Sequence, residues 1–139
     1  MRTDTTTFDS LASAQYACLT TFRRNGTAVP TPIWFAIYEP TGTIYIETGA
    51  TSGKVKRIRH TQRVTLAQCT ARGKVTGAVI EGKARIITDA EEIFIAKEAL
   101  HSKYGLKRQV FYFVMHLIGS IRRAADLQHI YIAIEPSTK

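Results

Sequence analysis

Apolar and polar residues alternate along most of this chain, a pattern typical of strands that bury one face. Turn signals such as Asn25-Gly26 separate the runs and indicate antiparallel hairpins. Short antiparallel strands with helices inserted at one side favour a small barrel over a doubly wound sheet. The predicted strands cover residues 16–24, 28–38, 43–48, 63–70, 77–87 and 127–134.

Two prolines change the interpretation of the second run. Pro30 and Pro32 have no N–H to donate to a neighbouring strand, so the first half of this run must be an edge strand or a bulge. The second half, Ile33–Tyr38, is apolar and is predicted to be a buried strand. The prolines could simply protect a sheet edge, or they could free backbone groups to meet a flat polar ring, and both alternatives remain open.

Helical spacing appears in four other segments, which cover residues 8–15, 52–62, 88–104 and 106–125. In the first of them, Leu11 is expected to face inward. In the second, Val55, Ile58 and Gln62 are expected to face the sheet, whereas Lys56, Arg59 and Arg63 point elsewhere. Within the last, residues 110–121 are apolar all round, which fits core packing, a subunit interface or the cover of a substrate pocket.

Length and composition indicate a single domain over residues 1–139. The two cysteines, Cys18 and Cys69, lack the spacing of a zinc site or a disulfide scaffold. The first residues have no apolar signal segment, and the longest apolar run is too short to span a bilayer. These observations predict a cytoplasmic protein that contains no metal and needs no membrane.

Positive charge is concentrated in one part of the chain. The formal net charge is +8, and the segment from Thr48 to Ile80 holds seven Lys or Arg and no Asp or Glu. Five of the seven lie between Ser52 and Arg63, where a turn leads into a helix. A helix start offers unpaired N–H groups and the positive end of the dipole, so we expect a bound anion, most simply a phosphate. Nucleic acid fits less well, because aromatic residues are not interleaved with the cations.

Catalytic motifs are absent from the sequence. There is no nucleophile elbow, zinc-binding motif, Walker loop or dinucleotide fingerprint, and the four histidines are scattered. No catalytic residue can therefore be assigned. An enzyme of this kind usually relies on a cofactor for its chemistry.

Five motifs occur in an order that resembles a known family. They are Thr20-Thr-Phe-Arg-Arg-Asn-Gly, Thr31-Pro-Ile-Trp-Phe, Ile44-Tyr-Ile-Glu-Thr-Gly, Ser52-Gly-Lys-Val-Lys-Arg-Ile-Arg and Glu81-Gly-Lys-Ala-Arg. This set resembles the split β-barrel flavin and deazaflavin oxidoreductases, the relatives of pyridoxamine phosphate oxidase. The likeness is greatest to the branch that uses coenzyme F420. It implies a mainly β fold, namely a six-stranded antiparallel split β-barrel with flanking helices.

The resemblance also implies a cofactor site at the interface of a homodimer. By position, Lys54 would bind the cofactor phosphate with help from Ser52 and from Lys56 or Arg57, and Thr48 would lie nearby. The segment Thr31, Pro32, Ile33 and Trp34 would contact the cofactor ring, and Gln68 would make a further contact. The expected activity is hydride transfer between coenzyme F420 and a small organic substrate. The alternatives are an FMN-binding flavoprotein and a cofactor-binding protein without turnover. The chain ends without the arginine and histidine signature of true pyridoxamine phosphate oxidases, which argues against vitamin B6 oxidation.

Overall fold

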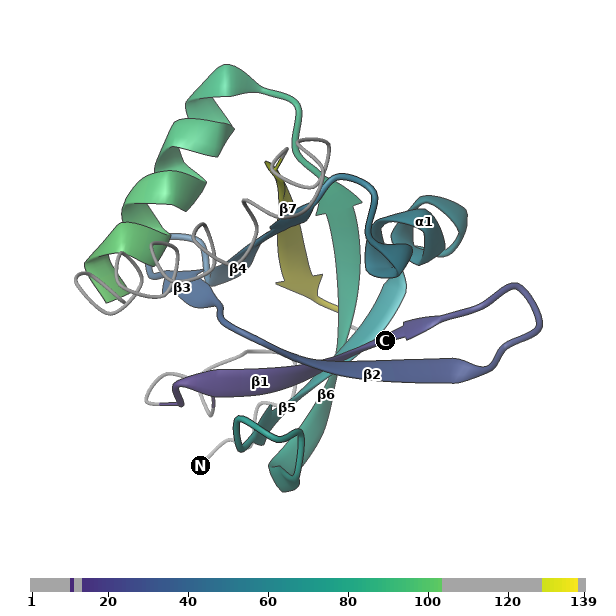
Figure 1. The fold of residues 1–139 in the computed structure, drawn as a ribbon. Coiled ribbons are helices and arrows are strands. Elements are labelled where there is room, and N and C mark those ends of the chain that lie inside the picture. Colours follow the sequence, from purple (N-terminus) through teal and green to yellow (C-terminus); the bar gives the residue numbers. More distant parts are fainter. Residues whose placement is uncertain (1–10, 12–13, 104–128, 138–139) are drawn as a thin grey trace, which may run out of the picture.

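The fold is a single antiparallel sheet of seven strands that curls round on itself (Figure 1). It is seen in a computed structural model that describes residues 11, 14–103 and 129–137. The order of strands in the sheet is β2-β1-β5-β6-β7-β4-β3. The strands are β1 (Tyr16–Phe22), β2 (Ala28–Ile33), β3 (Ala36–Tyr38), β4 (Thr43–Gly49), β5 (Arg63–Cys69), β6 (Val75–Ile86) and β7 (His129–Pro136).

The inner face of the sheet carries the hydrophobic core. Leu19, Leu66 and Ile80 stand opposite one another on β1, β5 and β6, and all three are buried. The helix α1 (Gly53–His60) covers one end of this core with Val55 and Ile58, as the sequence predicted. Leu11 is also buried in this core and faces inward as expected.

A second helix, residues 90–103, lies against the outside of the sheet (Figure 1). Its buried residues Ala96 and Leu100 form a separate cluster with Tyr45 of β4 and Tyr131 of β7. Asp89 caps the start of this helix, because its Oδ2 accepts a hydrogen bond from the Glu92 N–H at 2.9 Å. The helix predicted over residues 88–104 is thereby confirmed. No helix in the described part of the chain is long and apolar enough to cross a membrane.

The mainly β antiparallel fold is confirmed, but the number of strands is seven instead of six. The run predicted as Ile33–Tyr38 is not one strand, because β2 ends at Ile33 and β3 begins at Ala36. The two strands lie at opposite edges of the sheet, so the chain must leave one edge and cross to the other at this point. Phe35, in the crossing, is fully buried in the core. The prediction that the prolines lie on an edge strand is confirmed, since β2 pairs only with β1.

Four smaller expectations were wrong or fall outside the described residues. Gln62 does not face the sheet: it is exposed and lies past the end of α1, and its carbonyl accepts a hydrogen bond from the Ala84 N–H at 2.8 Å. Strand β6 begins at Val75, two residues before the predicted start, because a tight turn with Gly73 at φ 92° shortens the loop. The predicted helix over residues 106–125, with its apolar segment 110–121, lies outside the described residues, as does most of the helix predicted over 8–15.

Candidate anion and cofactor site

The start of α1 lies directly after β4, and a short turn joins them. Strand β4 ends at Gly49, whose carbonyl accepts a hydrogen bond from the Ser52 N–H at 3.1 Å. Ser52 occupies the N-cap position with extended dihedral angles, and its hydroxyl does not cap the helix. No acidic residue lies in the first turn. The positive end of the helix dipole is therefore not neutralised by the helix itself.

Two cations meet at this helix start and are held by hydroxyl groups. The Lys54 Nζ donates to Thr48 Oγ1 at 3.3 Å, and Thr48 Oγ1 lies 3.2 Å from Ser52 Oγ. The Arg57 Nε donates to the Oγ1 of Thr21, a buried residue of β1, at 2.6 Å. Within the described part of the chain, neither Lys54 nor Arg57 contacts a carboxylate. Two partly buried cations without a counter-charge form a site that an anion would stabilise.

The electrostatics of Lys54 point the same way. Burial, and then the nearby charge of Arg57, lower the pKa of the Lys54 ammonium below its ordinary value. Both effects penalise the charged form, and a bound phosphate would offset both of them. The site therefore favours an anionic ligand over a neutral one.

Gly53 leaves room for the guanidinium of Arg57 at the helix start. A Cβ at this position would lie 2.8 Å from Arg57 Nη1. Because glycine has no side chain, the guanidinium can fold back over the first turn beside Lys54. Sequence reasoning missed Gly53 and Thr21 as parts of the site. The available signal was Thr21 itself, a hydroxyl at a position where the alternation of β1 places buried residues.

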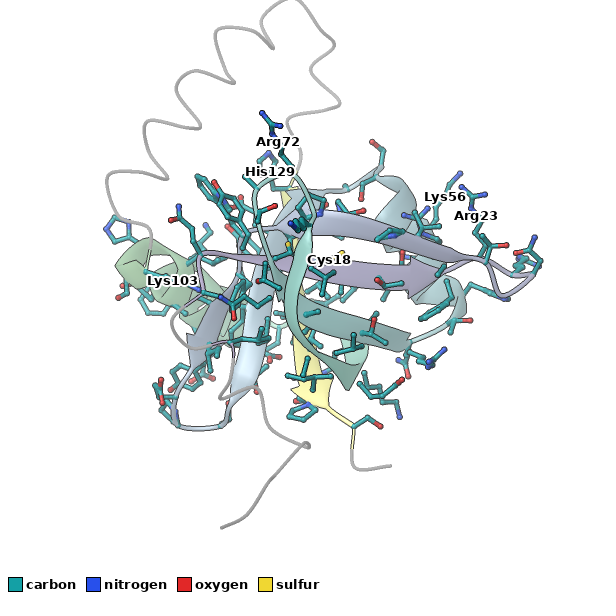
Figure 2. All side chains as sticks on the ribbon, turned by 90° about the horizontal axis from the view of Figure 1, so that it is seen from below. Cys18, Arg23, Lys56, Arg72, Lys103 and His129 are labelled. Carbon is teal, nitrogen blue, oxygen red and sulfur yellow. The ribbon has the colours of Figure 1, made fainter. Side chains whose placement is uncertain are left out.

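The predicted phosphate residues divide into two groups. Thr48, Ser52, Lys54 and Arg57 are brought together, whereas the Lys56 side chain is exposed and makes no hydrogen bond or ion pair with other described residues. Figure 2 shows Lys56 beside Arg23, at the surface end of the β1–β2 hairpin. Of the two predicted helpers of Lys54, the structure thus places Arg57 at the site and Lys56 on its outer margin.

The predicted ring-binding segment extends from this site along β2. Thr31 and Ile33 stand opposite Leu19 and Ala17, so they share the inner face of the sheet with Thr21. Pro32 points to the outer face, and Trp34 follows directly after the strand. Thr31 through Trp34 therefore run away from the anion site along one exposed edge of the sheet.

Gln68 lies at the far end of this segment. Ala17 pairs with both Ile33 and Gln68, which puts the three residues in one row across β2, β1 and β5. This row is four residues along β1 from Thr21, or about 13 Å at the usual rise of a strand. Gln68 is therefore remote from Lys54 and Arg57 and close to the predicted ring-binding segment.

Arg63 and Glu81 form an ion pair near this region. Arg63, part of the basic block in the sequence, makes a two-point contact with Glu81, with Nη2 and Oε2 2.9 Å apart, and covers the Phe22 ring. It lies outside the anion site. No group of three or more potential metal-binding side chains occurs among residues 11, 14–103 and 129–137.

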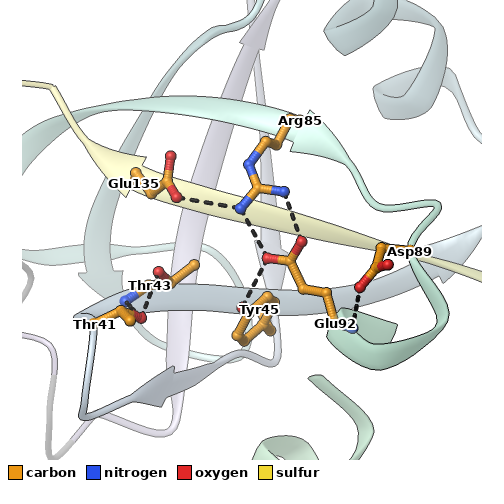
Figure 3. Close-up of polar contacts among 7 residues, drawn as sticks. All are labelled: Thr41, Thr43, Tyr45, Arg85, Asp89, Glu92 and Glu135. Atoms are coloured by element: carbon orange, nitrogen blue, oxygen red, sulfur yellow. Dashed lines mark hydrogen bonds and ion pairs between the residues drawn. The ribbon is translucent and has the colours of Figure 1, made fainter. Parts of the chain in front are cut away.

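A second polar cluster joins the outer helix to the sheet (Figure 3). The guanidinium of Arg85 donates to both oxygens of Glu92 at 2.8 Å and reaches Glu135 at 3.2 Å, while the Tyr45 hydroxyl donates to Glu92 at 2.9 Å. Burial and the bond to Glu92 raise the pKa of Tyr45 to about 12. Since its members are paired with one another, this cluster fastens the outer helix to the sheet.

Comparison with solved structures establishes the fold. A conserved hypothetical protein from Mycobacterium tuberculosis shares 20% identity, with a TM-score of 0.63 over 92% of this chain and 76% of its own. A protein from Bacteroides thetaiotaomicron, proposed as a 5-nitroimidazole antibiotic resistance protein, shares 16% identity, with a TM-score of 0.67 over 99% and 82% of the two chains. A pyridoxamine 5'-phosphate oxidase-related, FMN-binding protein from Nostoc punctiforme shares 16% identity, with a TM-score of 0.54 over 92% and 73%.

No curated protein matches the chain. The family model described as pyridoxamine 5'-phosphate oxidase, in contrast, matches residues 5–129, which is most of the sequence. The split-barrel fold expected from the sequence motifs is thereby confirmed, and the chain belongs to the pyridoxamine 5'-phosphate oxidase family.

Proposed function

We propose that this protein is an oxidoreductase that binds a phosphate-bearing flavin-type cofactor, with FMN as the first candidate. The observation that supports it most directly is the pair of cations Lys54 and Arg57, held by hydroxyls and not by carboxylates. A phosphate monoester fits this arrangement, because it accepts hydrogen bonds from both cations and from the N–H groups of the helix start. The family and the FMN-binding relative from Nostoc punctiforme support the same choice.

The cofactor ring would lie along Thr31–Trp34, with Gln68 near its far end. The distance of about 13 Å between the Thr21 and Ala17 positions suits a cofactor whose phosphate and ring are joined by a ribityl chain. When bound, the ring supplies the transfer of a hydride. The chain's own residues bind the phosphate, orient the ring and shield one side of it from water.

Coenzyme F420 is the second candidate for the cofactor. Its acidic tail would meet the exposed cations Lys56 and Arg59, which lie beside the anion site and have no carboxylate partner in the described chain. A binding protein without turnover is a further alternative, because the side chains at the described site include no histidine, cysteine or carboxylate.

We also propose a homodimer with the cofactor at its interface. The ring-binding strand β2 is an edge strand, and Thr31, Ile33 and Trp34 are each only partly buried. A second copy of the chain would cover the side of the ring that faces away from β1. Sedimentation at micromolar concentration tests this, and a monomer that still binds the cofactor tightly would contradict it.

The function is tested by titrating the purified protein with FMN, riboflavin and coenzyme F420 side by side. We expect Lys54→Ala to weaken FMN binding by about 10- to 100-fold, since one charge-assisted contact is lost. Lys97→Ala is the control, because Lys97 is an exposed lysine on the outer helix and has no part in this site. Unchanged FMN affinity in Lys54→Ala would refute the phosphate site, and stronger binding of coenzyme F420 than of FMN would favour the second candidate.

A further inference from the structure

A groove separates β3 from the outer helix, away from the anion site. Its volume is about 510 Å³, which lies within the usual range of small-molecule sites. Its apolar lining comes from Ile37 and Tyr38 on the β3 side and from Phe94, Ile95 and Ala99 on the helix. Phe94 is 62% exposed at this position. An exposed aromatic at a mainly apolar groove indicates room for the apolar body of a ligand.

Lys103 brings a positive charge to this groove. Its ammonium lies 3.5 Å from the centroid of the Phe35 ring, and Phe35 is fully buried. Lys103 itself is partly buried and is the one basic residue among the described lining residues. The two acidic lining residues, Glu39 and Glu98, are exposed, so water screens their charges more strongly than that of Lys103.

The groove begins where the proposed ring-binding segment ends. Trp34 is followed by Phe35, which Lys103 covers, and then by Ala36, which lines the groove. Figure 2 shows Lys103 at the opposite end of the molecule from Lys56, which belongs to the same helix as Lys54 and Arg57. A cofactor with its phosphate at Lys54 and its ring at Thr31–Trp34 would thus direct the ring toward this groove.

We propose that the groove is the substrate site, and that it binds a small organic anion whose apolar body lies between β3 and the helix and whose carboxylate or sulfonate contacts Lys103. The identification of this ligand as the substrate rests on the proposed function; the binding of an apolar anion does not. The volume fits one small molecule and is too small for a macromolecular partner. The partly buried cation selects an anion over a neutral ligand of the same shape.

The charge of Lys103 also gives the site a pH dependence. Burial lowers the pKa of Lys103 to about 8, so the ammonium loses its charge as the pH rises through that value. The other titratable groups that line the groove are Tyr38, Glu39 and Glu98. Lys103→Arg separates the effect of Lys103 from theirs, because a guanidinium stays charged throughout this range.

The test uses two fluorescent probes that share an aromatic body. The anion is 8-anilino-1-naphthalenesulfonate, and the uncharged analogue is N-phenyl-1-naphthylamine. We expect the wild-type protein to bind the sulfonate about tenfold more weakly at about pH 9.5 than at about pH 6.5, since the charged contact is lost. Binding of the uncharged probe should be the same at both values.

Three variants complete the test. Lys103→Met should bind the sulfonate about tenfold more weakly at low pH, with no further loss at high pH, and Lys103→Arg should keep its affinity at both values. Lys97→Met removes an exposed lysine of the same helix that does not line the groove, and it should behave like the wild type. Equal sulfonate binding by Lys103→Met and the wild type, or an equal pH dependence of both probes, would overturn the proposal.

The two proposals can fail separately. If FMN does not bind but the sulfonate shows the expected dependence on Lys103, the cofactor assignment falls and the groove remains an anion site. If Lys54→Ala weakens FMN binding but substitution of Lys103 leaves the sulfonate affinity unchanged, the groove is refuted as an anion site and the cofactor assignment stands.

Discussion

A side chain at position 53 would compete with the guanidinium of Arg57 for the same space. The contact of 2.8 Å involves the far end of a flexible side chain, so the guanidinium can move away without unfolding the helix. Its hydrogen bond to Thr21 would then be lost or lengthened. In the proposed site, a side chain at position 53 would therefore act on the ligand only through Arg57.

We therefore predict that Gly53→Ala weakens FMN binding about fivefold, as expected for the loss of roughly 1 kcal/mol of hydrogen bonding. Thermal stability should not fall, because alanine is a better helix former than glycine. Fluorescence titration and thermal melting measure the two effects. Gly49→Ala is the control, since a Cβ there would meet nothing within 4 Å. An FMN affinity equal to that of the wild type would show that Arg57 does not contact the phosphate.

Sequence reasoning found the part of this site that is local in the chain. Thr48, Ser52 and Lys54 lie within seven residues, so a turn followed by a helix start was enough to place them together. Thr21 is 36 residues from Arg57, and only the pairing of β1 with its neighbours brings it near α1. A local sequence pattern cannot predict a contact between residues so far apart in the chain, which is why Thr21 was missed.

At the scale of elements, the outer helix is attached through Glu92. The pKa of the Glu92 carboxyl is lowered, chiefly by its hydrogen bonds from Arg85. A carboxyl whose pKa is lowered by folding stabilises the folded state. This contribution is complete at pH values above the pKa in the unfolded chain, which is about 4.3. This stabilisation is lost as the pH falls through the lower pKa of Glu92 in the folded protein.

Glu92→Gln is expected to lower the free energy of unfolding by about 1–3 kcal/mol at neutral pH, since Arg85 and the Tyr45 hydroxyl lose their charged partner. The difference from the wild type should shrink only as the pH falls through the lowered pKa of Glu92, where the wild-type carboxylate is itself protonated. Denaturant unfolding from neutral pH down into acid measures it, with the exposed Glu91→Gln as control. A difference that is equally large in acid would contradict the assigned role of the ion pair.

The alternation of residues predicted most strands and their inner faces, because one buried face imposes a period of two. It failed at Ile33–Tyr38, where both halves are apolar and alternation cannot mark a break. The break arises from topology: β2 and β3 occupy the two edges of one sheet. The cluster of Arg85, Glu92 and Tyr45 was likewise invisible, since its members come from three different elements.

At the scale of the whole molecule, the net charge of +8 is unevenly distributed. Arg63 and Arg85 are paired with carboxylates, whereas the cations at and around the start of α1 have no carboxylate partner among the described residues. This end of the molecule therefore attracts anions through a field that salt can screen.

We predict that FMN binding weakens several-fold when ionic strength rises from about 50 to about 500 mM, because the Debye length falls to a few ångströms. Riboflavin has the same ring and ribityl chain but no phosphate, so its weaker binding should change little. Fluorescence titration of both ligands measures the effect. An equal salt dependence of the two affinities would show that the charge at α1 does not act on the phosphate.

Strand β7 has a consequence for how the protein is made. It pairs with β6 on one side and with β4 on the other, and among the described strands it alone joins β3 and β4 to the rest of the sheet. Glu47 of β4 pairs with Tyr131 of β7, which follows it by more than eighty residues in the chain. A ribosome adds about 5–20 residues per second, so β4 must spend several seconds without this neighbour. During synthesis, the nascent chain therefore exposes the unpaired edge of an apolar strand until β7 emerges, and this is the stage at which a chaperone would protect it from aggregation.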